Sequence, residues 1–402
     1  MGARRDASRA WAPGAPRAAA HPAGAGVAQF AGVRAEGVLD YADLTSAPEA
    51  LDAGGWWALA GEFGGPVHAW RFARVGKVRT APDAATPAAH PARTGAPGSA
   101  DQGAEQDGGA HLWSGPPRDL WSSSMDRSAY LHAVQATQAA IREGEVYQAN
   151  ICRMLSAPVP HRPDAAALAA VLGRGNPAPY AGYLDVQPEP DGAWPGAWVV
   201  TASPELSFAV EQGTIHTGPI KGTGRTPADL RGKDRAENVM ITDLVRNDLQ
   251  RICIPGTVTV TALLATEHHP GLVHLVSRVR GTLTGTPVRW GEVLAALHPP
   301  GSTSGAPKSS ALHLIDALEP VRRGVYCGQL GWIDADAQTA RVAVAIRTFT
   351  WASGQLQFGT GAGITIGSDP AAEWDETELK AANLVALASS SAPVCHPPAN
   401  GC

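Results

Sequence analysis

The segment Pro219-Ile220-Lys221-Gly222-Thr223 places one lysine on a backbone bend between a proline and a glycine. An apolar stretch leads into the bend, and Gly222 permits backbone angles that other residues avoid. This pattern predicts that Lys221 is held in a pocket. Burial favours the uncharged form of an amine, and an uncharged lysine can attack carbon. Lys221 is therefore a candidate nucleophile, although a solvated surface charge is the ordinary alternative.

Acidic residues recur at helical spacing in two further segments. Asp234 and Glu237 are three residues apart, and Glu373, Glu376 and Lys380 occupy positions i, i+3 and i+7. Such spacing places side chains on a common helix face. A solvated face would explain most acidic pairs. The alternative is that Glu237 and Glu376 meet across a site and hold Mg²⁺, which prefers one or two protein carboxylates, waters and a substrate anion.

Three glycine-containing stretches could bind an anion through backbone N–H groups. They are Gly222-Thr223-Gly224, Gly301-Ser302-Thr303-Ser304-Gly305 and Gly361-Ala362-Gly363. The middle stretch lacks the spacing of a nucleoside triphosphate loop, which disfavours that ligand.

Two basic residues lie inside apolar strands. Arg347 requires either a substrate carboxylate or a structural ion pair as its partner. His274, between Val273 and Leu275, is either a packed core histidine or part of the site.

The elements that must position these side chains follow from periodicity and turn residues. Helices are expected near residues 126–141, 164–173, 233–249, 290–296, 309–318 and 370–388. Strands are expected at 146–152, 180–185, 198–202, 206–210, 214–216, 257–263, 273–281, 326–334, 341–350 and 355–359, with further strands before residue 78. This alternation predicts an α+β fold, a large two-sheet β-sandwich flanked by helices.

Composition divides the chain into four expected parts. Residues 1–27 are rich in Ala, Gly, Pro and Arg and are expected to be a disordered leader, with a weaker likeness to a transit peptide. Residues 28–120 are expected to form an N-terminal subdomain of strands with a disordered insert at 79–118. Residues 121–388 are expected to form the catalytic domain, and residues 389–402 a flexible tail.

Charge and apolar content exclude several classes of function. The net charge is −5, and 44% of the 402 residues are hydrophobic while 17% are charged. These values give no general attraction to nucleic acid or anionic membrane. No apolar run approaches the length of about 20 residues that spans a bilayer. The five cysteines form no CxxC pair, which fits a cytoplasmic protein without structural disulfides or a zinc site.

The chain from about 121 to 388 resembles the chorismate-utilising enzymes, which include anthranilate synthase, aminodeoxychorismate synthase component I, and the isochorismate and salicylate synthases. The matching stretches, in family order, are Ser203-Pro204-Glu205, Pro219 to Thr223, Asp234 to Asn238, Asp243 to Leu249, His274 to Ser277, Gly305 to Lys308, Arg323 to Gly328, Ile346 to Thr348, Gly361 to Ile364 and Glu373 to Thr377. Gly218 departs from the pattern, because related sequences often have arginine there.

The resemblance implies roles for these residues. Mg²⁺ would bind Glu237 and Glu376, with Asp234 and Glu373 nearby, and would hold the ring carboxylate of chorismate. The other carboxylate would be bound by Arg347, Tyr326 and the backbone at Gly361, Ala362 and Gly363. Gly222, Thr223, Ser302 and Lys380 would also contact substrate. Lys221 would attack the ring, Glu205 would protonate the departing hydroxyl, and His274 would orient groups at the ring.

Within the family, the Pro-Ile-Lys-Gly-Thr stretch resembles aminodeoxychorismate synthase component I, because anthranilate synthases carry alanine at the lysine position. That likeness implies 4-amino-4-deoxychorismate as the product, for 4-aminobenzoate and folate or a related pathway. None of the five cysteines lies in a Gly-x-Cys-x-Gly context, so ammonia is expected from a separate glutamine amidotransferase subunit. The alternatives are a sibling enzyme that makes anthranilate or 2-amino-2-deoxyisochorismate, and a non-catalytic chorismate-binding module.

Overall fold

A computed structural model of the protein describes residues 24–78, 112–224, 226–230, 232–269 and 272–393. Its helices are α1 (Arg127–Arg142), α2 (Ala165–Gly175), α3 (Gly232–Gln250), α4 (Trp290–Leu297), α5 (Lys308–Leu318) and α6 (Pro370–Ala388). Short 3-10 turns lie at Pro48–Ala53, Arg118–Leu120, Pro227–Asp229 and, as η4, at Gly301–Thr303. Each helical range predicted from the sequence overlaps one of these helices, with ends that differ by at most two residues.

The strands fall into three stretches of the chain. The first holds β1 (Gly24–Phe30), β2 (Val33–Asp43), β3 (Trp56–Gly61), β4 (Val67–Lys77), β5 (Leu112–Ser114) and β6 (Ser122–Ser123). The second holds β7 (Gln148–Pro158), β8 (Tyr180–Val186), β9 (Ala197–Ser203), β10 (Leu206–Glu211), β11 (Thr214–Gly218) and β12 (Ile220–Gly224). The third holds β13 (Thr259–His269), β14 (Leu272–Thr282), β15 (Gly305–Ala306), β16 (Gln329–Asp334), β17 (Thr339–Val344), β18 (Thr348–Ala352), β19 (Gln355–Ile364) and β20 (Ser391–Pro393).

Helix ends follow local capping chemistry. Asp126, Asp164 and Asp369 stand before α1, α2 and α6, and each side chain accepts a hydrogen bond from the backbone N–H three residues later. These bonds satisfy donors that the first helical turn leaves without a partner. The helix that carries Glu373 and Glu376 therefore begins at a position fixed by its own sequence.

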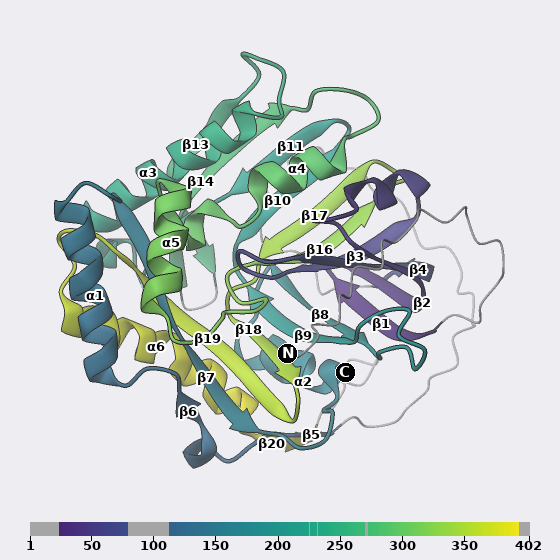
Figure 1. Ribbon diagram of the computed structural model, residues 1–402, viewed down its shortest axis with the longest axis horizontal. Coiled ribbons are helices and arrows are strands. Elements are labelled where there is room, and N and C mark those ends of the chain that lie inside the picture. The colour runs from purple at the N-terminus through teal and green to yellow at the C-terminus, as the bar shows by residue number, and fades with distance from the viewer. Residues whose placement is uncertain (1–23, 79–111, 225, 231, 270–271, 394–402) are drawn as a thin grey trace, which may run out of the picture.

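The α+β class is confirmed, and eighteen of the described strands belong to one hydrogen-bonded sheet. The sheet is antiparallel, and its long ladder joins β7 to β19 over ten residue pairs. Pairing of β10 with β17, and of β3 with β16, joins segments that are at least 130 residues apart in the chain. The two layers expected of a sandwich are thus continuous at their edges, and the sheet curls round on itself (Figure 1).

Helices cover the sheet in two groups. Figure 1 shows α1 and α6 side by side along β7 and β19, and α3 beside β13 and β14. α5 packs against β7, close to the short strand β15. None of the helices in these ranges is both long enough and apolar enough to cross a membrane.

Apolar clusters lie beneath these helices. One cluster joins Trp57 of β3 with Phe208 of β10, Ile241 of α3 and Trp290 of α4, all buried. It therefore packs residues from near the start of the chain against residues more than 150 positions later, and this long-range burial favours the closed shape of the sheet.

The expected boundaries need correction where pairing overrides composition. β1 begins at Gly24, inside the predicted leader 1–27, because it pairs with both β2 and β8. Leu112–Ser114, placed in the insert 79–118, pairs with Ser391–Pro393 of the predicted tail. The sheet also has no break between 28–120 and 121–388, since β3 pairs with β16. Residues 1–23, 79–111 and 394–402 lie outside the described ranges.

Candidate active site

Lys221 lies on β12, where the ladder to β14 is irregular between Ile220 and Thr223. Gly222 has a φ of +91°, and a Cβ there would lie 2.8 Å from the Cβ of Asp234 on α3. The glycine therefore permits both the bend and the close approach of α3. The part-buried Lys221 Nζ donates a hydrogen bond to the backbone oxygen of Ser302 at 3.0 Å.

Glu205 occupies the turn between β9 and β10 and is only 4% exposed. Its backbone N–H donates to Ser203 Oγ at 3.2 Å, and its carbonyl accepts from Val344 N at 3.0 Å. Burial raises the pKa of its carboxyl group, while a hydrogen bond with Ser302 and the charge of Lys221 oppose that rise. The net effect favours a protonated acid, which is the form a general acid must have.

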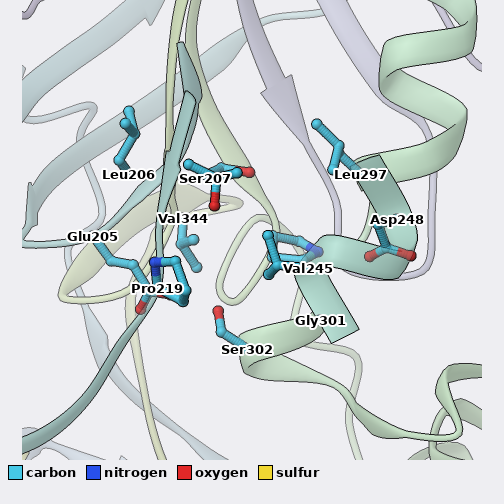
Figure 2. Close-up of a pocket in the computed structure, with 12 residues that line it drawn as sticks. Glu205, Leu206, Ser207, Pro219, Val245, Asp248, Leu297, Gly301, Ser302 and Val344 are labelled. Atoms are coloured by element: carbon cyan, nitrogen blue, oxygen red, sulfur yellow. The ribbon is translucent and has the colours of Figure 1, made fainter. Parts of the chain in front are cut away.

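A small pocket opens beside this pair. Figure 2 shows Glu205 and Pro219 on one side and Val245 and Asp248 on the other, with Ser302 between them. Asp248 is held by Lys308, whose Nζ lies 2.9 Å from Asp248 Oδ2. The pocket reaches Glu205 and Ser302 but not the acidic residues of α6, so it covers one side of the site only.

Glu237 of α3 and Glu373 of α6 lie around one lysine, while the sharing of an ion by Glu237 and Glu376 stays a prediction. Lys233 Nζ lies 2.5 Å from Glu373 Oε1 and 3.7 Å from Glu237 Oε1. Burial lowers the pKa of Lys233, but the hydrogen bond and charge of Glu373 outweigh it, so the pKa is raised. Glu376 pairs instead with Lys380, 2.6 Å away on the same helix.

The electrostatics of the two glutamates differ. Burial raises the pKa of Glu237, although the charges of Lys221 and Lys233 oppose it. Burial also acts on Glu376, but Lys380 outweighs it and the pKa of Glu376 is lowered. The charge of Lys221 lowers the pKa of both Glu237 and Glu376. The lysine bend therefore lies close enough to the acidic helices to form one site with them.

These groups suit a divalent cation by their chemistry. Glu237 Oε1 is buried and has no hydrogen-bond partner among the described residues. Carboxylate oxygens are the ligands that Mg²⁺ prefers, with water and substrate completing its shell. In the part of the chain that the structure describes, no three His, Cys, Asp or Glu side chains form a ready-made metal site. A cation bound by these carboxylates would need water and a substrate anion to complete its shell.

The glycine strand β19 passes beside this cluster. Gly361 accepts a hydrogen bond from Lys380 Nζ at 3.0 Å, and Ala362 is buried. A Cβ at Gly363 would lie 2.3 Å from Gln148 Nε2 and 3.6 Å from Glu237 Oε2. Pairing of β18 with β19 stops at Phe358, so beyond it the second edge of β19 pairs with none of the described strands. The backbone of 361–363 can therefore offer groups to a ligand.

Arg347 and Tyr326 lie near the same end of the sheet. Arg347 has a φ of +52°, which is strained for a residue other than glycine. Its guanidinium makes no hydrogen bond or ion pair with any described residue, and burial lowers its pKa. Tyr326 is 6% exposed and packs its ring against Gly359, two residues before Gly361. A cation held without an anion indicates an anion site.

His274 lies on β14, directly opposite Thr223 of β12, and is 2% exposed. The structure therefore places it on the strand adjacent to the lysine bend. Its predicted role in orienting the ring is not tested by this position and stays a prediction.

Sequence reasoning missed two residues that the structure places in or beside the site. Lys233 bridges Glu237 and Glu373, and its i, i+4 spacing to Glu237 was the available signal. Arg153 of β7 contacts the helix that carries Glu373 and Glu376. No local pattern identifies it, because its partners on α6 lie more than 220 residues away.

A family model for chorismate binding enzymes matches residues 79–386, and the chain belongs to that family. It is 38% identical over 270 residues to anthranilate synthase component 1 of Streptomyces coelicolor, covering 64% of this chain and 50% of that protein. It is 36% identical over 269 residues to aminodeoxychorismate synthase component 1 of Salmonella typhimurium, covering 64% and 57%. The chain thus spans about half the length of these relatives.

Solved structures confirm the fold. The 2,3-dihydroxybenzoate-specific isochorismate synthase DhbC of Bacillus anthracis superposes with a TM-score of 0.68 at 20% identity, covering 90% of this chain and 95% of the other. Anthranilate synthase component I of Streptococcus pneumoniae gives 0.63 at 21% identity, covering 95% of both chains. At these identities the likeness extends to the architecture alone.

Proposed function

We propose that the protein converts chorismate and ammonia to 4-amino-4-deoxychorismate, as an aminodeoxychorismate synthase component I. The observation that carries the proposal is the pairing of Lys221 with a buried Glu205 through Ser302. Relatives at comparable identity bear both this name and that of anthranilate synthase. The lysine in Pro-Ile-Lys-Gly-Thr favours the former, because anthranilate synthases have alanine at that position.

In the proposed reaction the Lys221 amine forms a bond to C2 of the chorismate ring. Both conjugated ring double bonds shift, the bond from C4 to its hydroxyl breaks, and Glu205 donates the proton that turns this group into water. Ammonia then bonds to C4, both double bonds shift back, and the bond from C2 to Lys221 breaks. The sum is chorismate plus ammonia giving 4-amino-4-deoxychorismate plus water, with the protons balanced between Lys221 and Glu205.

The remaining residues hold the dianionic substrate. Arg347, Tyr326 and the backbone of 361–363 would bind the enolpyruvyl carboxylate, and the unpartnered guanidinium supports this role. Glu237 and Glu376 would hold Mg²⁺, with Asp234 and Glu373 beside them. That ion would neutralise and orient the ring carboxylate when bound.

Ammonia is proposed to come from a separate glutamine amidotransferase subunit, a cytoplasmic partner. The relatives named component 1 support a two-component arrangement.

The test is identification of the product. Purified protein is incubated with chorismate, Mg²⁺ and an ammonium salt at alkaline pH, and the products are separated and identified by mass spectrometry and retention time. We expect 4-amino-4-deoxychorismate. Anthranilate as the main product would overturn the assignment in favour of the sibling activity, which the 38% identity to an anthranilate synthase keeps as the second candidate. Binding of chorismate without turnover would indicate a non-catalytic module.

A further inference from the structure

Arg153 is a buried cation on β7 whose contacts converge on α6. Its side chain is 2% exposed. Its Nε donates to Thr377 Oγ1 at 3.0 Å, its Nη1 donates to Ser123 Oγ at 3.0 Å, and its Nη2 pairs with Glu378. The guanidinium carbon lies 4.2 Å from the ring centroid of Trp374. Three of these four partners lie on one turn of α6.

That turn also carries the acidic residues of the site. At 100° per residue, Trp374, Thr377 and Glu378 lie on one side of the helix, and Glu373 and Glu376 lie on the adjacent side. A contact that fixes the first set therefore fixes the direction in which the second set points. β7 also pairs with β19, which carries Gly363. A Cβ built at Gly363 would lie 3.6 Å from Glu237 Oε2, so β19 passes close to the acidic residue of α3.

We propose that Arg153 is a positioning residue, which locks the rotation and depth of α6 so that Glu373 and Glu376 face Glu237 and can share a divalent cation. The inference rests on the cation site of the proposed function. A guanidinium suits this task because its planar fork bonds in three directions at once while its face stacks on an aromatic ring. A lysine offers one point charge and cannot make these contacts together.

The neighbourhood of Trp374 supports a role in alignment. The ring also meets Tyr130 of α1, with centroids 5.7 Å apart in an edge-on arrangement. Thr360 Oγ1 of β19 donates to the backbone oxygen of Thr377 at 2.8 Å. Glu378 is 56% exposed, so its ion pair alone adds little stability in water. The contact between Arg153 and α6 therefore depends on the buried stacking on Trp374 and the hydrogen bond to Thr377.

The chain provides a matched control at Arg162. Its guanidinium also stacks over a tryptophan, 5.7 Å from the centroid of Trp351, and pairs with Asp185 at 2.6 Å. Its other bonds go to backbone oxygens of β8 and β9, away from α6. Replacing either arginine by methionine removes a stacked, ion-paired guanidinium, but only Arg153→Met frees α6.

The experiment measures binding of Mn²⁺ alone by electron paramagnetic resonance, using the full chain. Disturbing residues that orient metal ligands typically weakens binding about 10- to 100-fold. We expect Arg153→Met and Arg153→Lys to weaken Mn²⁺ binding within that range, and Arg162→Met to change it less than about twofold. Urea unfolding of each variant shows that the protein assayed is folded.

If Arg153→Met does not fold, Thr377→Val serves as a second variant, because it removes the hydrogen bond from Arg153 Nε and leaves the arginine in place. It should weaken Mn²⁺ binding by a smaller factor. Equal binding by Arg153→Met and Arg162→Met would overturn the proposal, and so would wild-type protein that binds no Mn²⁺. Formation of anthranilate would overturn the proposed function while leaving this result intact, because the readout does not depend on the product.

Discussion

At the scale of single residues, the site depends on a carboxyl group that is kept from water beside a lysine. Glu205 is 4% exposed, and Lys221 is bonded to Ser302, which also contacts Glu205. Both residue types and their order were visible in the sequence, but their contact was not. It depends on Ser302, which is 81 positions from Lys221 and is brought to it by η4.

The role of Glu205 is tested by Glu205→Gln, which keeps the size of the side chain but removes the proton donor. We expect the turnover rate to fall about 10²- to 10⁴-fold, while chorismate binding changes little. Glu211→Gln is the control, because Glu211 ends the same strand β10 and its side chain is 60% exposed. Steady-state rates and an equilibrium binding assay measure both effects. Full turnover by Glu205→Gln would contradict the role of acid.

Stability should depend on pH through the same carboxyl group. Its folded pKa lies above the ordinary value of 4.5, so the folded state binds the proton more tightly than the unfolded state. The stability that this proton contributes is complete below about pH 4.5 and is lost as pH rises through the folded pKa.

We therefore expect wild type to lose stability relative to Glu205→Gln between acidic and neutral pH. Urea unfolding of both proteins at several pH values measures the difference. A difference that stays constant with pH would contradict this account.

At the scale of elements, helices were more predictable from sequence than strands. α1, α3 and α6 appear where apolar periodicity and turn residues placed them. Strand ends were shifted, because a partner strand sets them: β13 was expected at 257–263 and spans Thr259–His269 along β14. The pairing of β5 with β20 had no local signal at all.

The cap of α6 offers a test at this scale. Asp369→Ala removes the 2.8 Å hydrogen bond from Ala372 N and should cost about 1 kcal/mol of unfolding free energy. Asp126→Ala removes the equivalent 2.8 Å bond from α1 and should cost a similar amount. Only Asp369→Ala should also weaken Mn²⁺ binding, because α6 carries two of the acidic residues. Equal Mn²⁺ binding by the two variants would contradict this link.

At the scale of the whole molecule, the N-terminal strands are part of the sheet that holds the site. β3 pairs with β16, and Trp57 of β3 is buried with Phe208, Ile241 and Trp290. Composition suggested a separate subdomain at 28–120, because local patterns show strands but not their partners. Helical spacing indicated that acidic residues share a face within each helix, whereas Arg153 had no local signal, because only the closed sheet brings β7 to α6.

Trp57→Ala tests whether the N-terminal strands fold together with the rest of the sheet. Removal of a fully buried tryptophan should cost about 3–5 kcal/mol of unfolding free energy, in one cooperative transition of the whole chain. Val75→Ala, at a 46% exposed position on β4, should cost less than about 0.5 kcal/mol. Urea denaturation followed by tryptophan fluorescence and by circular dichroism measures both variants. A separate early transition in Trp57→Ala would show that the N-terminal strands fold independently.

The most direct test of the account concerns Lys221 itself. The protein is incubated with chorismate and Mg²⁺ without ammonia, quenched with acid, digested, and its peptides are mapped by mass spectrometry. We predict that the peptide containing Lys221 carries the mass of chorismate less one water, and that Lys221→Ala lacks it. An unmodified Lys221 peptide from protein that still forms the amino product when ammonium is added would contradict the claim that this lysine attacks the ring.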